Sequence, residues 1–252
     1  MSLVEILWPA FVLAIMLVFV HAIFGLEIIK RGVIFTDLAI GQIAAIGMAI
    51  SVAFFGGEYQ TLFTLFFALG AAVVIAYASK RVQKIEAFIG LLYALGISSM
   101  MLILAKSSEG MELFNKLSAA DILFTLPHDL MSSFAVYALI AAVMFFVYPR
   151  TSGFVRELVF FVSLGLTVTS SVQLAGVLVV FALLVAPAYA ASSQNFAKPL
   201  IFAWVFGTVA IVVALFVSYL FDLPTGYTMI FSVVLASLFF EFISGLKTEQ
   251  LE

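Results

Sequence analysis

Cysteine is absent from this chain of 252 residues, and charged residues are scarce, at 10% of the total. The lack of cysteine excludes a disulfide framework, a thiolate metal site and a thiol redox pair, so metal chemistry would have to use histidine, carboxylate or amide groups. The net charge of -3 is spread over short loops rather than gathered on one basic face. This distribution gives no electrostatic footprint for nucleic acid, so a nucleic-acid partner is excluded.

Apolar residues, in contrast, make up 65% of the chain. A soluble domain is about half apolar and about a quarter charged. Roughly 20 apolar residues cross a hydrocarbon core about 30 Å thick, and stretches of that length recur along the whole chain. Runs this long without strict alternation exclude barrel strands of about ten residues, which leaves helices as the structure that satisfies the backbone in lipid. The sequence therefore predicts an all-α, polytopic transmembrane helix bundle that forms a single domain over residues 1–252.

Nine apolar segments can be distinguished, and their length identifies them as helices. Only the region 154–193 is ambiguous, because it is either one overlong helix or two helices. Two helices keep Lys198 and Lys247 on the same side of the membrane as the other basic residues. We therefore predict a break near Ser170 and a bundle of eight or nine helices, with a broken or short helix near 157–173. The nine segments are 7–28, 33–55, 61–79, 87–105, 131–148, 154–171, 174–193, 199–221 and 226–245.

The basic residues predict the orientation, because the positive-inside rule places them on the cytoplasmic side. If the first helix runs from outside to inside, all but Lys106 and Lys116 are cytoplasmic. We therefore expect the N-terminus outside the cell and the C-terminus in the cytoplasm. The residues placed on the cytoplasmic side are Lys30, Arg31, Lys80, Arg81, Lys84, Arg150, Arg156, Lys198 and Lys247.

Three polar side chains are predicted to lie inside the bilayer, where an ionisable group costs at least about 2.5 kcal/mol and is a functional hypothesis by default. At 1.5 Å per residue, His21 lies about 15 Å above the cytoplasmic end of its helix, and Asp37 and Gln42 about 9 and 16 Å above theirs. An imidazole, a carboxylate and an amide oxygen on neighbouring helices could bind a hard or borderline divalent cation. At 100° per residue, Asp37 and Gln42 point about 140° apart, so they face one ion directly only if the helix is distorted.

Each of these residues also has a purely structural explanation. For His21, a neutral ring hydrogen-bonded between helices is as well supported as a role with metal or protons. For Gln42, an interhelical hydrogen bond is favoured over a role in binding. For Asp37, a functional role is favoured over a structural one, because a buried carboxylate is costly to keep for packing alone.

Other polar residues lie near the predicted break. Ser170, Ser171 and Gln173 offer hydroxyl and amide oxygens to a passing substrate, or they satisfy backbone groups that the break leaves unpaired. We treat them as candidates for a substrate path.

Charged residues near the predicted cytoplasmic ends resemble interfacial or partner-contacting charges. The candidates for contact with a partner are Glu86, Arg150 and Arg156. No nucleophile triad, phosphate-binding loop or paired-carboxylate site can be assembled from the remaining residues, so the sequence predicts that the protein is not an enzyme.

The stretch His21–Gly47 resembles the first helix pair of the permease subunits of zinc/manganese/iron-type ABC importers. It is closest to a branch whose second helix carries the pattern D-L-A-x-x-Q-I-A-A-x-G. The later matches cover most of the chain, and the most distinctive is the block that ends in a Pro-Ala pair and is followed by Leu-Pro-Thr-Gly. In chain order they are Glu86–Ser98, Asp121–Leu130, Thr167–Ala191 and Phe221–Ile230.

This resemblance implies a homodimeric permease in a bacterial-type inner membrane. Each copy would dock on a cytoplasmic ATPase subunit and receive metal from an extracytoplasmic metal-binding protein. ATP would be used only through the partner subunit. The substrate would be a divalent metal ion such as zinc, manganese or iron, and no covalently bound cofactor is implied.

Two departures from the family pattern matter for function. Many members place a histidine four residues after the second-helix aspartate, where this chain has Gly41 followed by Gln42. After Tyr148-Pro149-Arg150 the family usually has a cytoplasmic stretch of about one helix, whereas this chain has only residues 151–157 before the next span. The second departure keeps open an alternative, an ATPase-independent facilitator or regulatory membrane partner built on the same scaffold.

Overall fold

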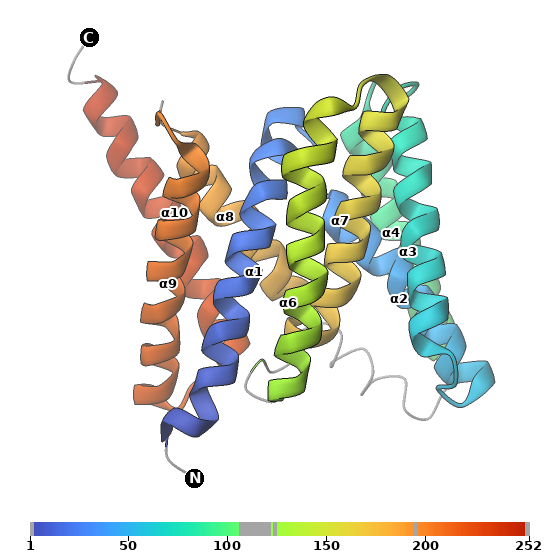
Figure 1. The fold of residues 1–252 in the computed structure, drawn as a ribbon, viewed down its shortest axis with the longest axis horizontal. Helices are drawn as coiled ribbons and strands as arrows, with labels where there is room; N and C mark the ends of the chain where they lie inside the picture. Colours follow the sequence, from blue (N-terminus) through green and yellow to red (C-terminus); the bar gives the residue numbers. More distant parts are fainter. Residues whose placement is uncertain (1–2, 106–121, 123–124, 194–195, 250–252) are drawn as a thin grey trace. The chain divides into compact units, whose positions relative to one another are not determined.

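The computed structural model describes residues 3–105, 122, 125–193 and 196–249 (Figure 1). The elements described are all helical, which confirms the predicted fold class, and each of the nine predicted apolar segments corresponds to one long helix. Within these residues, eight helices are long and apolar enough to cross a membrane, whereas α8 is shorter, at 16 residues. The helices are α1 (Leu3–Arg31), α2 (Thr36–Phe55), α3 (Gln60–Ala78), α4 (Ile85–Leu104), α6 (Pro127–Ala142), α7 (Gly153–Ala175), α8 (Val177–Ser192), α9 (Pro199–Phe221) and α10 (Thr225–Glu249).

The chain divides into two compact units, and each is described by itself. Unit 1 consists of Met1–Arg31, Asp121–Ala135 and Leu178–Glu252. Unit 2 consists of Gly32–Ala120 and Val136–Val177. Helix α6 begins in unit 1 and ends in unit 2. The single domain expected from the sequence stays a prediction.

The position of the predicted break is corrected by α7, which is continuous over 23 residues. Ser170 and the segment 157–173 therefore lie within an unbroken helix. The chain turns instead at Gly176, whose φ of 81° lies in the region that favours glycine. Because α8 begins at Val177, the prediction of two helices in this region is confirmed.

The hydroxyl side chains near the predicted break form hydrogen bonds within α7. The Thr169 hydroxyl donates to the Gly165 carbonyl at 2.7 Å, and the Ser171 hydroxyl donates to the Thr167 carbonyl at 2.7 Å. Such bonds to the preceding turn allow serine and threonine to sit inside a helix without interrupting its backbone ladder. The sequence therefore predicted the break between the two helices in the right region but at the wrong residue.

The connection between α6 and α7 is as short as the sequence suggested. A π-helical turn (Val143–Val147) and a 3-10 turn (Tyr148–Arg150) extend α6. Only Thr151 and Ser152 then precede α7. This continuously described stretch holds no additional helix.

In unit 2, α2 packs against α3, α4 and α7. Small residues allow the close approach. A Cβ atom at Gly47 would overlap the backbone of Phe63 on α3, and one at Gly96 of α4 would lie 2.8 Å from the Cβ of Gln42. Helices in lipid associate largely through such close packing, because the lipid tails remove the hydrophobic difference between buried and exposed faces.

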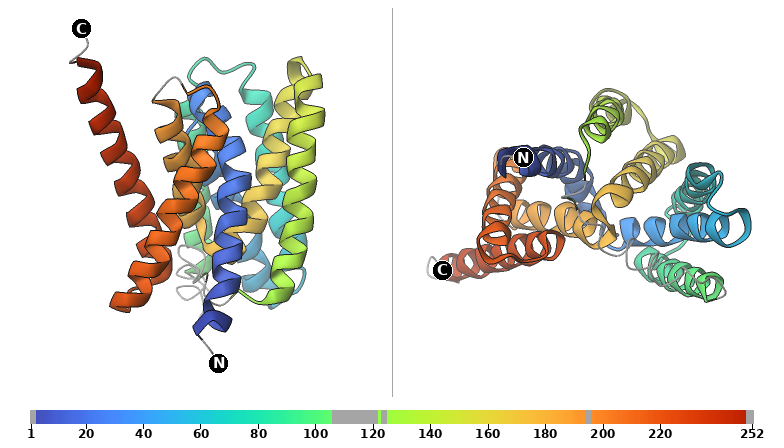
Figure 2. Two further views of the ribbon diagram at one scale, coloured as in Figure 1. Left: turned by 60° about the vertical axis from the view of Figure 1, so that its left-hand side comes forward. Right: turned by 90° about the horizontal axis from the view of Figure 1, so that it is seen from below.

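In unit 1, α9 packs against α1 and α10 (Figure 2). The Phe19 and Trp204 rings stack with centroids 4.7 Å apart, and the Trp204 Nε1–H donates to the Phe19 carbonyl at 3.0 Å. Ser237 of α10 donates to the Ala186 carbonyl of α8 at 2.8 Å. Aromatic stacking and side-chain-to-backbone hydrogen bonds thus join the helices of this unit.

The α2–α3 contact predicts the effect of a single methyl group. We expect Gly47→Ala to lower the thermal unfolding midpoint, because overpacking a close helix contact costs about 1–3 kcal/mol. The matched control is Gly70→Ala on α3, where an added Cβ has no atom within 4 Å and the helix propensity gain is up to about 1 kcal/mol. Thermal unfolding of the detergent-purified protein measures both, and equal midpoints for wild type and Gly47→Ala would contradict the contact.

Candidate functional site

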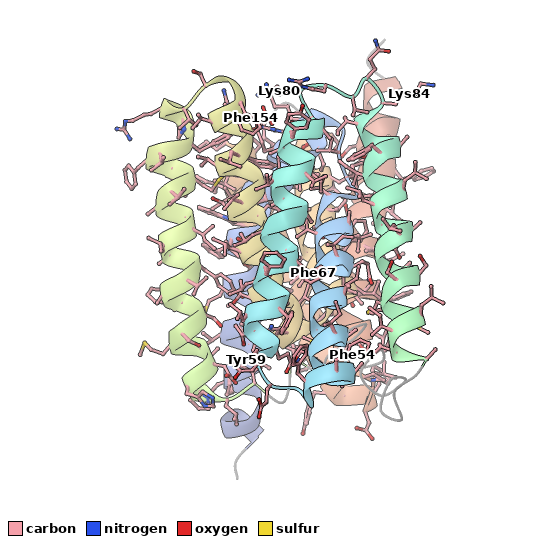
Figure 3. All side chains as sticks on the ribbon, turned by 90° about the vertical axis from the view of Figure 1, so that its right-hand side faces the viewer. Phe54, Tyr59, Phe67, Lys80, Lys84 and Phe154 are labelled. Atoms are coloured by element: carbon pink, nitrogen blue, oxygen red, sulfur yellow. The ribbon has the colours of Figure 1, made fainter. Side chains whose placement is uncertain are left out.

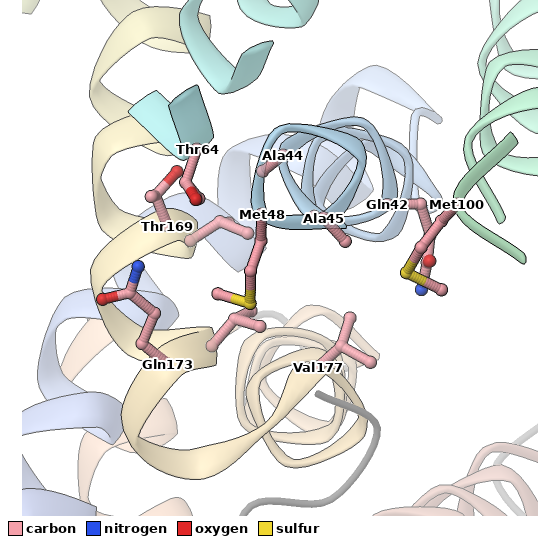
Figure 4. Close-up of a pocket in the computed structure, with 12 residues that line it drawn as sticks. Gln42, Ala44, Ala45, Met48, Thr64, Met100, Thr169, Gln173 and Val177 are labelled. Carbon is pink, nitrogen blue, oxygen red and sulfur yellow. The ribbon is translucent and has the colours of Figure 1, made fainter. Parts of the chain in front are cut away.

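A small pocket lies among the helices of unit 2 (Figure 4). Its volume is about 20 Å³. A water molecule needs roughly 10–15 Å³, so the pocket accommodates one water molecule or one largely dehydrated ion. The lining residues are Gly41, Gln42, Ala44, Ala45 and Met48 of α2, Thr64 of α3, Met100 of α4, Val168, Thr169, Val172 and Gln173 of α7, and Val177.

The α2 side of the pocket follows from helical spacing. Gly41, Ala44, Ala45 and Met48 are related by steps of three and four residues, which places them on one face of the helix. A Cβ at Gly41 would lie 3.4 Å from Val177 and 3.6 Å from Val168, so glycine here leaves space that a larger side chain would fill.

Gln42 provides the most distinctive polar group of the pocket. Its side chain is 8% exposed, and its Oε1 atom has no hydrogen-bond partner in the part of the chain that the structure describes. An unpaired buried oxygen of this kind costs about 1–3 kcal/mol. The interhelical hydrogen bond that the sequence favoured is therefore not made by Oε1 within the described residues, and this atom is available to a ligand in the pocket.

Two threonines add oxygen atoms to the lining. The Thr64 hydroxyl donates to the Gln60 carbonyl and the Thr169 hydroxyl donates to the Gly165 carbonyl, each at 2.7 Å. Because the hydroxyl proton is used within the helix, the oxygen lone pairs remain as acceptors. Figure 4 shows Thr64, Thr169 and Gln173 at one side of the pocket and Gln42 and Met100 at the other.

Two methionines complete the lining, and the sequence analysis did not identify them. Met48 of α2 and Met100 of α4 are buried, and they also pack in an apolar cluster with Ala45, Ala49 and Leu104. Because methionine is an apolar residue, composition does not distinguish a methionine that lines a pocket from one that fills the core. The available signal was the spacing of Met48, which is seven residues from Gly41 on the same helix face.

Asp37 lies on α2 in its first turn, beyond the pocket. It precedes Gly41 by four residues, so it shares the pocket-lining face about 6 Å further along the helix. The residue is 1% exposed, and neither carboxyl oxygen has a hydrogen-bond partner among the described residues. The N-terminus of α2 favours a negative charge at this position.

Asp37 and Gln42 do not share one site in this arrangement. Helix α2 is a regular helix over its 20 residues, so the angle of about 140° between the two side chains is kept. Gln42 lines the pocket and Asp37 does not. The two residues instead form successive polar positions along the same helix.

His21 belongs to unit 1, where it is buried on α1. Its Nδ1 lies 2.8 Å from the Leu17 carbonyl oxygen, an acceptor, so Nδ1 carries a proton and donates this bond within α1. Among the described residues, no three or more histidine, aspartate or glutamate side chains lie close enough to hold a metal ion.

Of the three candidates for a substrate path, only Gln173 lines the pocket. It is exposed and therefore lies at the open side. The Ser170 hydroxyl is 3.5 Å from the Tyr137 hydroxyl, and the Ser171 hydroxyl donates within α7. These two serines have contacts elsewhere in the unit.

Among the candidates for partner contact, Glu86 and Arg156 already have contacts in unit 2. Glu86 of α4 accepts a hydrogen bond from the Phe35 backbone N–H at 3.2 Å, which caps the start of α2. The Arg156 guanidinium lies over the Tyr148 ring, 4.6 Å from its centroid. Arg150 is exposed and donates to the Phe146 carbonyl.

A salt bridge also ties the α3–α4 turn to α7 near these residues. Lys80 and Glu157 lie 3.2 Å apart, and Glu157 is largely buried. Figure 3 shows Lys80, Lys84 and Phe154 at one end of the unit, with Phe54 and Tyr59 at the other. The basic residues of the α3–α4 turn therefore lie at the same end as the α6–α7 connection.

The chain is similar in sequence and in fold to known proteins. The chain is 24% identical over 229 residues to the manganese transport system membrane protein MntC of Listeria innocua, which covers 84% of this chain and 81% of that protein. The fold of the present chain is similar to that of a chain in the structure of PsaBC from Streptococcus pneumoniae in complex with Fab, with a TM-score of 0.72 and 23% sequence identity. The match covers 94% of the present chain and 91% of the PsaBC chain. The ABC 3 transport family matches residues 3–244. A match over nearly the whole length means that this chain belongs to the ABC 3 transport family.

Proposed function

We propose that this chain is the membrane-spanning subunit of an ABC-type importer of a divalent metal ion, of the manganese, zinc or iron class. Family membership makes it a membrane component of a transporter rather than a catalytic subunit. The similarity to a manganese transport protein supports the substrate class. The observation that carries the proposal is the buried Asp37 carboxylate, aligned on one helix face with a pocket for a single ion.

The pocket and Asp37 have complementary tasks on such a path. Amide and hydroxyl oxygens in the pocket replace water around an ion, but they are neutral and leave its charge uncompensated. The Asp37 carboxylate supplies negative charge about 6 Å away along α2. Because charges interact more strongly where water is excluded, this carboxylate is the group best suited to draw a divalent cation through the membrane interior.

His21 is a separate candidate, in unit 1. Imidazole is a borderline ligand that suits zinc and iron, whereas carboxylate and amide oxygens also suit manganese. We propose that His21, Asp37 and Gln42 each contact the ion, with Gln173 at the open side of the pocket. Ser170 and Ser171 are left with a supporting role in α7.

The proposed orientation places the N-terminus outside and the C-terminus in the cytoplasm. It is supported by the positive-inside rule. In unit 2, the basic residues Lys80 and Lys84 gather at one end, and the opposite end carries the aromatic residues Phe54 and Tyr59 (Figure 3). Lys106 and Lys116 lie outside the described residues.

The proposed partners are a second copy of the chain, a cytoplasmic ATPase subunit and an extracytoplasmic metal-binding protein. The family supports these partners as a class. The ATPase would contact the basic end of unit 2, where Arg150 and Phe154 are exposed beside the α6–α7 connection. The short connection Thr151–Ser152 is also the observation that favours the alternative, a facilitator or regulatory partner that works without an ATPase.

The role of Asp37 is tested by Asp37→Asn, which removes the negative charge and keeps the shape. We expect uptake of labelled manganese or zinc to fall at least about tenfold at equal surface expression. The matched control is Asp222→Asn, at a residue with φ 51° where asparagine is well tolerated, and it should leave uptake unchanged. His21→Ala in the same assay tests the unit 1 position. Wild-type uptake in both variants would remove these residues from the path.

Orientation is tested by cysteine labelling, since the natural chain has no cysteine and therefore no background. The exposed residue Lys198 precedes α9 and is replaced in the variant Lys198→Cys. We expect a membrane-impermeant maleimide to label this variant only after the cytoplasmic side is opened. Labelling of intact cells would contradict the orientation.

ATPase coupling is tested by purifying the native complex. We expect an ATPase subunit to co-purify with the wild type and to be lost at least in part with Arg150→Glu, because that change reverses an exposed charge at the proposed contact. Glu58→Lys, which reverses an exposed charge in the turn before Tyr59 at the other end of the unit, is the control and should retain the ATPase. If no ATPase accompanies even the wild type, the facilitator alternative is favoured.

A further inference from the structure

The pocket in unit 2 has the properties of a binding site that is complete within that unit. The buried Gln42 amide oxygen lacks a partner among the described residues and lines a space of about 20 Å³. Thr64 and Thr169 direct their hydroxyl protons into their own helices, so their oxygen atoms can only accept. All three groups are therefore acceptors, which is the polarity that a cation requires.

The size of the pocket determines how an ion is bound. A volume of about 20 Å³ is close to that of a single water molecule, so an ion cannot enter with its full hydration shell. The lining side chains must replace the water that is lost. Side-chain oxygen is supplied by Gln42, Thr64, Thr169 and Gln173. The amide nitrogens of the two glutamines are donors and do not bind a cation, so the remaining side-chain ligand atoms of the lining are the sulfur atoms of Met48 and Met100.

This set of lining atoms does not meet the ligand requirements of hard ions. Ca²⁺ takes six to eight oxygen ligands, and Mg²⁺ loses water reluctantly and requires a near-octahedral oxygen shell. Four oxygen-bearing side chains fall short of either requirement. Borderline ions such as zinc accept softer ligands, and thioether sulfur is among the softest that proteins provide.

We propose that Met48 and Met100 determine specificity in this pocket, with thioether sulfurs that favour a borderline divalent ion such as zinc over Mg²⁺ and Ca²⁺. The proposal rests on the metal-import function proposed above and names the chemistry by which that site selects its substrate. The two residues approach from different helices, α2 and α4, so the filter depends on the close α2–α4 contact at Gly96. The two sulfur atoms would also allow the pocket to discriminate between metal ions without a charged ligand.

The competing explanation is that the methionines only fill space. Both pack against Ala45, Ala49 and Leu104 in the same apolar cluster. Leucine has nearly the volume of methionine and is usually tolerated in its place, so the exchange keeps the packing and removes the sulfur. Packing and ligand chemistry are therefore separable by one substitution.

The test compares wild type with the double variant Met48→Leu/Met100→Leu. Met101→Leu is the matched control, because Met101 lies on α4 beside the same apolar cluster but does not line the pocket. Uptake of labelled zinc is measured in cells with increasing Mg²⁺ and Ca²⁺. Displacement of bound zinc by Mg²⁺ is measured on the purified protein in lipid nanodiscs, after its thermal unfolding midpoint shows that each variant is folded.

We expect the double variant to be inhibited at about tenfold lower Mg²⁺ and Ca²⁺ concentrations than wild type, with the control unchanged. Unchanged competition in the folded double variant overturns the proposal and leaves metal import intact. Gln42→Leu places an apolar side chain at the pocket and should abolish binding in nanodiscs, and full binding by this variant also overturns the proposal. If cells take up no metal but Mg²⁺ displacement in nanodiscs still changes, import fails while the selectivity of the pocket stands.

Discussion

The close packing of α2 against its neighbours is the constraint on which the rest of unit 2 depends. At Gly47 the helix lies against the backbone of α3, and at Gly96 the backbone of α4 lies against the Cβ of Gln42. These contacts leave little space between the helices, and they hold the Gln42 amide where it lines the pocket. A larger residue at either glycine would separate the helices and move Met48 and Met100 away from the same small volume.

The polar groups of unit 2 separate two tasks that a metal path must combine. Neutral oxygen and sulfur atoms line the pocket, where they can replace water. The Asp37 carboxyl group lies one helical turn from Gly41, which lines the pocket on the same helix face. Gly41 occupies the position at which many members of the family have histidine. On the path that we propose, unit 2 depends on Asp37 for charge and on the pocket for selection.

The end of unit 2 that carries Lys80 and Lys84 has a different character. The Lys80–Glu157 salt bridge joins the α3–α4 turn to α7, and Glu86 of α4 accepts a hydrogen bond at the start of α2, so several charges at this end hold helices together. Arg150 and Phe154 remain exposed beside a connection of two residues, Thr151 and Ser152. This described stretch contains no separate helix between the 3-10 turn and α7.

Much of the architecture was predictable from the sequence, because lipid offers no partner to the backbone and long apolar segments must therefore form helices. The same physics singled out Asp37, since a carboxylate inside a membrane is costly wherever the helix packs. Tertiary structure decided which residues share a site. Met48, Thr64 and Met100 come from three helices, and their meeting depends on helix rotation and on the approach permitted at Gly47 and Gly96, which no single segment encodes. It also decided that α7 continues to Gly176, because the hydroxyls of Thr169 and Ser171 bond within the helix rather than interrupt it.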